Sequence, residues 1–206
     1  MELKIRRGIS YLLGLFILAI GITLTIVSQL GTGAWDALSV GLASITGLTV
    51  GNWVILVGII LIIVNAILQK ARPDFLAIIT VVLLGYFIDF WLLFVFRDVG
   101  FEGFAIQLAI LLIGVVTMGL GIATYLQGKF AVIPIDGFMF TLQKLFGFKL
   151  MVAKTTAELV ALVLAFFVGG PIGIGTIIVT LLIGPLIQFF FPKIEHLVEG
   201  KVITIK

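Results

Sequence analysis

Long stretches without a charged side chain alternate with short polar segments along the chain. Four of these stretches, Gly8–Leu30, Ala37–Gln69, Gly103–Gly128 and Leu159–Pro192, contain no Asp, Glu, Lys or Arg. A helix of about 20 apolar residues is long enough to cross a bilayer. The pattern therefore predicts six transmembrane helices, at Gly8–Leu30, Val50–Gln69, Phe75–Phe96, Phe104–Gln127, Phe148–Val168 and Thr176–Phe191.

Two shorter apolar segments lie between the first and second helices and between the fourth and fifth. Trp35–Thr46 and Ile135–Phe146 would each be about 18 Å long as helices, too short to span a membrane. Asp36 and Asp136 lie near their starts, where we expect a carboxylate to cap the free N–H groups of the first turn. The pattern favours re-entrant half-helices, and helices lying flat at the membrane interface are the alternative.

The composition agrees with a single membrane domain that covers residues 1–206. Hydrophobic residues make up 62% of the chain and charged residues only 11%, so a soluble enzyme is excluded. Six spans leave no room for a soluble catalytic or nucleic-acid-binding domain, and no enzyme activity is expected. The absence of cysteine and the single histidine, His196, argue against a metal site, and no cofactor is expected.

Basic residues are distributed unevenly between the two sides of the predicted membrane. Eleven lie in the tails and loops of one side, at Lys4, Arg6, Arg7, Lys70, Arg72, Lys129, Lys144, Lys149, Lys193, Lys201 and Lys206. The other side has Arg97 alone. The positive-inside rule therefore places both termini, including a tail at residues 193–206, in the cytoplasm.

The two halves of the chain resemble each other. Leu12, Gly14, Gly21, Ile22, Asp36, Leu42 and Gly47 align with Leu112, Gly114, Gly121, Ile122, Asp136, Leu142 and Gly147 at an offset of 100 residues. We interpret residues 8–96 and 104–192 as two repeats. Each repeat has three crossings, an odd number, so the second would be inverted in the membrane. Such a 3+3 inverted repeat with two short helices is common among secondary transporters.

Several segments resemble a known family. Residues 30–36 read Leu-Gly-Thr-Gly-Ala-Trp-Asp, residues 84–89 read Leu-Gly-Tyr-Phe-Ile-Asp, and residues 182–187 read Leu-Ile-Gly-Pro-Leu-Ile. This pattern is similar to the YczE/YyaS/YitT group of bacterial integral membrane proteins. The chain lacks the soluble C-terminal domain of the YitT branch, so it resembles the short YczE-like branch. The resemblance implies a multi-pass protein of the bacterial inner membrane and leaves the substrate open.

Polar side chains inside the predicted spans are the candidates for solute or ion binding. Glu158 lies near the midplane of the fifth span and Lys154 one turn before it, where an ion pair between them is the structural alternative. Asp89 lies in the outer third of the third span, where it could simply reach interfacial water, and Gln188 in the inner third of the sixth. The full candidate set is Asp36, Asp89, Asp136, Lys154, Glu158 and Gln188. Gly58, the counterpart of Glu158, would leave room beside it for a solute.

Glycines seven residues apart mark one face of the first and fourth spans. These are Gly14 and Gly21, and Gly114 and Gly121. Because small residues let transmembrane helices approach closely, we expect helix packing at these positions.

Together these features predict a small-solute transporter. The acids favour a cationic or zwitterionic solute, or coupling to protons or sodium ions. Two alternatives stay open: the substrate-binding component of a vitamin-uptake complex, and a scaffold or assembly factor that transports nothing. The expected partners are the lipid bilayer and an unidentified small molecule, with no nucleic acid, and a homodimer is left open.

Overall fold

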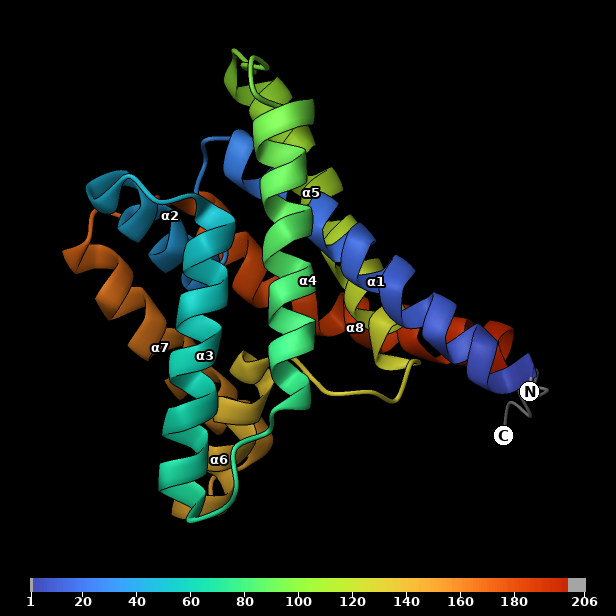
Figure 1. The fold of residues 1–206 in the computed structure, drawn as a ribbon. Coiled ribbons are helices and arrows are strands. Elements are labelled where there is room, and N and C mark those ends of the chain that lie inside the picture. Colours follow the sequence, from blue (N-terminus) through green and yellow to red (C-terminus); the bar gives the residue numbers. More distant parts are fainter. Residues whose placement is uncertain (1, 200–206) are drawn as a thin grey trace.

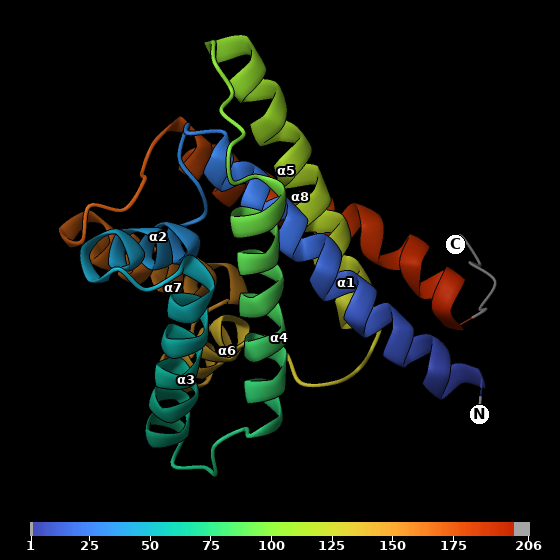
Figure 2. The ribbon, with the colours of Figure 1, turned by 45° about the horizontal axis from the view of Figure 1, so that its top comes forward.

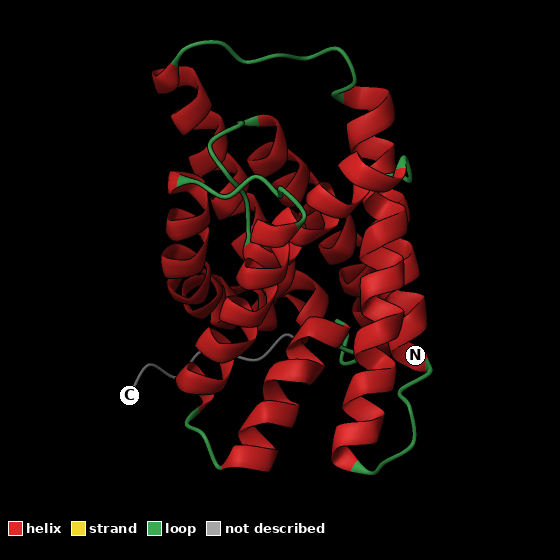
Figure 3. Ribbon diagram, turned by 90° about the vertical axis from the view of Figure 1, so that its left-hand side faces the viewer, coloured by secondary structure: helices red, strands yellow, loops and turns green. Residues whose placement is uncertain are grey.

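The computed structural model describes residues 2–199, which form helices joined by loops and contain no strand (Figure 3). The elements are α1 (Glu2–Val27), α2 (Ala34–Thr46), α3 (Val50–Gln69), α4 (Leu76–Phe90), the π-helical turn η1 (Trp91–Val95), α5 (Phe104–Leu126), α6 (Pro134–Phe146), α7 (Leu150–Phe167) and α8 (Ile174–Glu199). The predicted all-α class is confirmed.

Six of the described helices are long and apolar enough to cross a membrane: α1, α3, α4 with η1, α5, α7 and α8. They lie where the hydropathy pattern predicts them, and the two short helices α2 and α6 fall on the two predicted half-helices. Two ends differ most: α1 already begins at Glu2, before the predicted Gly8. Helix α8 continues through Pro192 to Glu199 and makes part of the predicted tail helical. Lys201 and Lys206 lie outside the described residues.

The helices form two groups, each with its own apolar core. The first group contains α1, α4, α5 and α8, and its core includes Leu15, Ile88 and Leu111, none of which is exposed. The second contains α2, α3, α6 and α7 around Trp35, Leu61 and Phe138. Figures 1 and 2 show these groups on opposite sides of the molecule, with α4 between them. We call them the long-helix bundle and the half-helix bundle.

Helix pairing follows a similar pattern in the two halves of the chain. The half-helix α2 packs on α3 and α7, and α6 likewise packs on α7 and α3, so each touches one long helix from its own half and one from the other. Helices α1 and α5 form the most extensive pair. One pairing differs: α3 packs along α4 and joins the two bundles, whereas α7 makes little contact with α8.

The first half-helix is buried at its start and exposed at its end. Ala34 and Ala37 are buried, whereas Ile45 is 64% exposed. The helix stops at Gly47, whose φ of +76° is a conformation that glycine adopts without strain. The start of α2 is therefore packed inside the half-helix bundle, and its end lies at the surface of the protein.

This gradient predicts how cysteines along α2 will react in this cysteine-free chain. Ile45→Cys is expected to react readily with a membrane-impermeant thiol reagent. Ser39→Cys is expected to stay unlabelled, because Ser39 is only 2% exposed. Gel-shift labelling of intact cells and spheroplasts measures both positions. Equal labelling of the two would mean that α2 lies flat on the surface.

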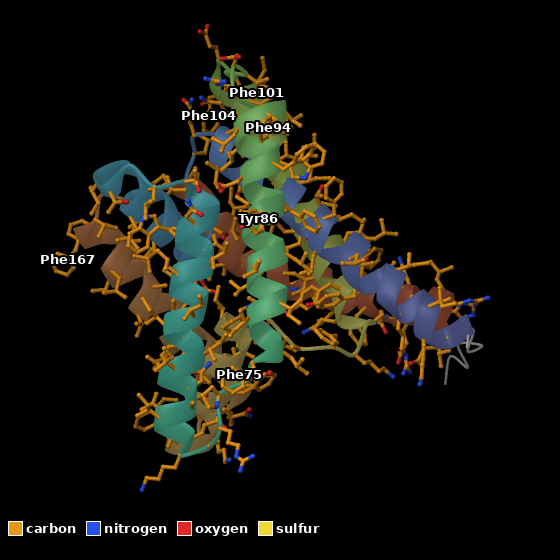
Figure 4. The ribbon with its side chains drawn as sticks, in the orientation of Figure 1. Phe75, Tyr86, Phe94, Phe101, Phe104 and Phe167 are labelled. Carbon is orange, nitrogen blue, oxygen red and sulfur yellow. The ribbon has the colours of Figure 1, made fainter. Side chains whose placement is uncertain are left out.

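The outer surface of the molecule is apolar. The side chains of Phe75, Tyr86, Phe94, Phe104 and Phe167 are 59–78% exposed, and Figure 4 shows them on the outer surface of several helices. An apolar surface of this extent is soluble in lipid and not in water. The chain is therefore a multi-pass membrane protein.

Candidate functional site

Ionisable side chains from three helices lie near one another inside the half-helix bundle. Glu158, on α7, interacts electrostatically with Asp36 of α2, with Asp136 of α6 and with Lys154 of its own helix. Lys154 also interacts with Asp136. We call Asp36, Asp136, Lys154 and Glu158 the acidic cluster. The fold thus brings together four of the six predicted binding residues, from positions up to 122 residues apart in sequence.

The folding of α2, α6 and α7 explains how these residues meet. Asp36 and Asp136 are each the third residue of a half-helix whose first turn lies within the bundle. Glu158 is the ninth of the 18 residues of α7, so it lies halfway along that helix. Each of the four side chains is partly exposed, so the cluster is packed by protein without being sealed.

A stripe of four alanines brings α7 close to both half-helices. Ala153, Ala157, Ala161 and Ala165 recur every four residues and are 0–2% exposed. They belong to the core of the half-helix bundle, together with residues of α2 and α6. Because alanine has a small side chain, the stripe lets these backbones approach closely and holds Glu158 beside them.

The expectation that the two aspartates cap their helices is wrong. The N-cap positions are Gly33 and Ile133, and neither helix start is capped by a side chain. The carboxyl group of Asp36 makes no hydrogen bond or ion pair within residues 2–199. Its Oδ2 turns back toward Gly33, where an added Cβ would lie 2.9 Å away. A carboxyl group without a partner at a helix N-terminus is available to a ligand or a cation.

Asp136 has a partner that the sequence analysis did not identify. The Tyr125 hydroxyl, from α5, donates a hydrogen bond of 3.0 Å to its Oδ2. Tyr125 is 2% exposed and belongs to the core of the long-helix bundle. This hydrogen bond therefore joins the two bundles. A tyrosine within an otherwise apolar span is the signal that could have indicated this partner. The candidate set contained only charged side chains and one amide.

Removing this hydroxyl tests the bond. Tyr125→Phe is expected to lower the stability of the protein by about 1–3 kcal/mol, because Asp136 loses a buried donor. The ring and its packing are retained. Thermal unfolding in detergent measures the effect. The matched control is Tyr86→Phe, whose side chain is 65% exposed, and equal melting of all three proteins would contradict the assignment.

Lys154 and Glu158 do not form the ion pair that their spacing allows. The ion pairs within residues 2–199 are those that Arg7 and Lys129 make with Glu199. Lys154 lies near enough to attract Glu158 but more than 4.0 Å from it, as it does from Asp136. Within the described residues, no three His, Asp or Glu side chains form a group that could hold a metal ion.

Asp89 lies outside the acidic cluster. Its carboxylate accepts hydrogen bonds from the Thr49 hydroxyl and, at 2.7 Å, from the Gly51 N–H, at the start of α3. A Cβ on Gly51 would meet the Gly85 carbonyl, so glycine is needed for this approach of α4 to α3. Asp89 therefore fixes α4 to the start of α3, and it makes no bond to the cluster.

Gln188 also lies apart from the cluster. It is exposed on α8 and makes no hydrogen bond within the described part of the chain. Its side chain therefore makes none of the contacts that Asp89 makes. The space expected beside Gly58 is filled as well, because a Cβ there would meet Val81 of α4.

The glycines of the first and fourth spans lie where α1 crosses α5. A Cβ on Gly14 would meet the backbone of Tyr125, and one on Gly121 would meet the backbone of Leu18. Gly21 lies similarly close to Met118 and Gly114. Close approach at these positions sets the place of Tyr125, and hence of its hydrogen bond to Asp136.

A cavity of about 220 Å³ reaches the start of α6 from the α3–α4 loop. Its lining includes Arg72 and Asp74 at the loop, and Pro134 and Gly137 on either side of Asp136 in sequence. Asn65 donates a hydrogen bond of 3.1 Å to the Pro134 carbonyl at its inner end.

Two amides and a hydroxyl form a polar seam next to this cavity. Gln69 donates to the Thr141 hydroxyl at 2.6 Å, and that hydroxyl lies 3.1 Å from Asn65 Oδ1. These three residues were missed because uncharged polar groups near a helix end are common and carry little signal. They give the cavity a polar wall between α3 and α6.

The chain matches the model of a family of unknown function, DUF6198, over residues 5–192. It is similar to the protein YyaS of Bacillus subtilis, with 43% identity over 186 residues, covering 90% of this chain and 92% of YyaS. It is 34% identical to the membrane protein YczE of the same organism, covering 91% of this chain and 86% of YczE. A Haemophilus influenzae protein is 29% identical over 93% of this chain and 86% of its own length. No solved structure matches the chain.

Proposed function

This chain belongs to the DUF6198 family, and from the position of its acidic cluster we propose that it is a small-solute transporter. The observation that carries the proposal is that Glu158 lies within electrostatic range of both Asp36 and Asp136, on three different helices, inside a membrane protein. Ionisable groups in that setting are costly and are typical of solute or ion pathways.

The charges of the cluster indicate the kind of solute. Three carboxyl groups face one ammonium group, so the site attracts a positively charged group when its acids are ionised. Lys154 offers a donor for a carboxylate, which makes a zwitterionic solute a good fit. Binding of a proton or a sodium ion by the acids would couple transport to an ion gradient.

The cavity supports transport from one side of the membrane. It leads from the α3–α4 loop to Pro134 and Gly137 at the start of α6, which flank Asp136 in sequence, although Asp136 itself is not part of its lining. Half-helices whose first turns meet a cavity are the usual way in which transporters hold a solute near the bilayer midplane. The Tyr125–Asp136 hydrogen bond lies between the two bundles, so a relative movement of the bundles would change the site.

The arrangement of the protein in the membrane forms part of the same proposal. We assign the chain to the bacterial inner membrane with both termini in the cytoplasm, because eleven basic residues flank that side. The similar packing of α2 and α6 supports an inverted repeat of residues 8–96 and 104–192. The cavity at the α3–α4 loop would then open to the cytoplasm.

Thermal unfolding of the purified protein tests the proposal. A ligand that binds only the folded state raises the melting temperature by mass action. Amino acids, polyamines, small cations and sodium would be screened at several pH values. A ligand found in this way would then be assayed for uptake into proteoliposomes. An increase in melting temperature followed by uptake supports transport. If no screened compound raises the melting temperature, a scaffold is favoured. Copurification with an ATPase module would favour a vitamin-uptake component.

A further inference from the structure

A second pocket lies at the start of α1, away from the acidic cluster. Its volume is about 300 Å³, and its lining includes Lys4, Arg7 and Tyr11 of α1, and Lys129 and Phe130 of the loop between α5 and α6. Among the residues that the structure describes, no acidic one belongs to this lining. The proposed transport site does not use this pocket.

Two of the three cations are held in place by one carboxylate. Glu199, at the end of α8, accepts from Arg7 at 2.8 Å and from Lys129 at 2.5 Å, both on Oε1. Within residues 2–199, Lys4 makes no ion pair, whereas Arg7 and Lys129 share the one carboxylate of Glu199. Arg7 Nε is buried and has no hydrogen-bond partner within residues 2–199. The described lining of the pocket thus retains positive charge.

The fold fixes the loop that carries Lys129. A Cβ on Gly128 would lie 2.6 Å from the Tyr11 Cβ, so the loop lies directly against α1. Lys129 follows with a φ of +50°, a left-handed conformation that is uncommon for lysine. Lys129 is therefore held toward α1 at some conformational cost, which a purely solvated loop would not require.

Apolar side chains extend from the pocket along the outer face of α1. Ile5, Ile9 and Leu12 are 49–55% exposed, and Phe130 is 44% exposed beside the cations. A free phosphate ion would use only the charges, whereas a phospholipid would use the charges and the apolar strip. The combination is complementary to an amphiphile with a negative head.

We propose that this pocket binds the phosphodiester headgroup of an anionic phospholipid, with Lys4, Arg7 and Lys129 around the phosphate and the acyl chains along α1. Under the proposed orientation, the lipid belongs to the cytoplasmic leaflet. Basic pockets beside transmembrane helices on that side are suited to such headgroups.

Native mass spectrometry of the full chain, released from detergent, tests the proposal. Dioleoyl phosphatidylglycerol and dioleoyl phosphatidylcholine are titrated against the parent protein and against Lys4→Gln/Lys129→Gln. We expect phosphatidylglycerol to bind the parent at least about tenfold more tightly than phosphatidylcholine does. The affinity of the double variant for phosphatidylglycerol should be about tenfold or more below that of the parent, because each cation near a phosphate contributes on the order of 1 kcal/mol.

Lys144→Gln/Lys149→Gln is the matched control, because it removes the same charge from exposed positions outside the pocket. Lys4→Gln alone leaves the Glu199 ion pairs intact and should lose part of the affinity without loss of fold. Equal binding of the two lipids, or equal losses in the pocket and control variants, would overturn the proposal. Displacement of phosphatidylglycerol by millimolar inorganic phosphate would identify a phosphate-ion site instead. None of these three outcomes tests transport at the acidic cluster.

Discussion

Replacing Glu158 by glutamine is expected to abolish solute binding and uptake while leaving the fold intact. The amide keeps the shape of the side chain but removes the charge that acts on Asp36, Asp136 and Lys154. Since Glu158 forms no hydrogen bond or ion pair within residues 2–199, its loss breaks no such contact. We expect affinity for the solute found by thermal screening to fall by about 100-fold, as for loss of a buried charge interaction. The free energy of unfolding should change by less than about 1 kcal/mol.

Two further variants separate this role from a structural one. Glu102→Gln, an exposed acid in the loop before α5, should leave binding unchanged. Glu158→Gln/Lys154→Met tests whether Glu158 serves only to balance Lys154. If Glu158 is needed for the solute, the double variant stays inactive. Recovery of full activity in the double variant would reduce Glu158 to the partner of a buried lysine.

Gly14→Ala is expected to unfold or strongly destabilise the protein, although it adds a single methyl group. The new Cβ would meet the backbone N and Cα of Tyr125, which cannot move without separating α1 from α5. The cost of such overpacking is about 3 kcal/mol or more when backbone must shift. Because Tyr125 donates to Asp136, any protein that still folds should also bind solute more weakly.

Gly8→Ala provides the comparison on the same helix. A Cβ at Gly8 has nothing within 4 Å, so alanine there should be neutral or stabilising by up to about 1 kcal/mol. Yield of monodisperse protein and thermal melting in one detergent measure both variants. If Gly14→Ala melts like Gly8→Ala, α1 and α5 do not cross as closely as described.

The course of the chain through the membrane could be predicted because hydropathy alone determines it. The six spans and both short helices lie where the hydropathy pattern placed them, and the family resemblance is confirmed. The resemblance was assigned to the YczE-like branch, but the chain shares more identical residues with YyaS than with YczE. The end of α8 was placed too early, because Pro192 followed by Lys193 reads as a helix stop and the helix instead continues through both.

The contacts of the site could not be predicted to the same degree. Asp36, Asp136 and Glu158 were each predicted as binding residues, but neither their proximity to one another nor the Tyr125 partner of Asp136 was predicted. Tyr125 approaches Asp136 only because α1 and α5 cross at Gly14, a tertiary relation that no local pattern contains. The same holds for Asp89, whose bond to the start of α3 depends on the contact between Gly51 and Gly85.

The alanine stripe of α7 has a consequence for how the half-helix bundle can move. Alanine has no side-chain rotamers, so nothing on this face of α7 must repack if the helix slides along α2 and α6. Because Ala153, Ala157, Ala161 and Ala165 are four residues apart, a shift of one repeat, about 6 Å, presents nearly the same surface again. The alanine face of α7 can therefore pack against α2 and α6 in more than one register. A slide of one repeat would carry Glu158 about 6 Å along the starts of the two half-helices.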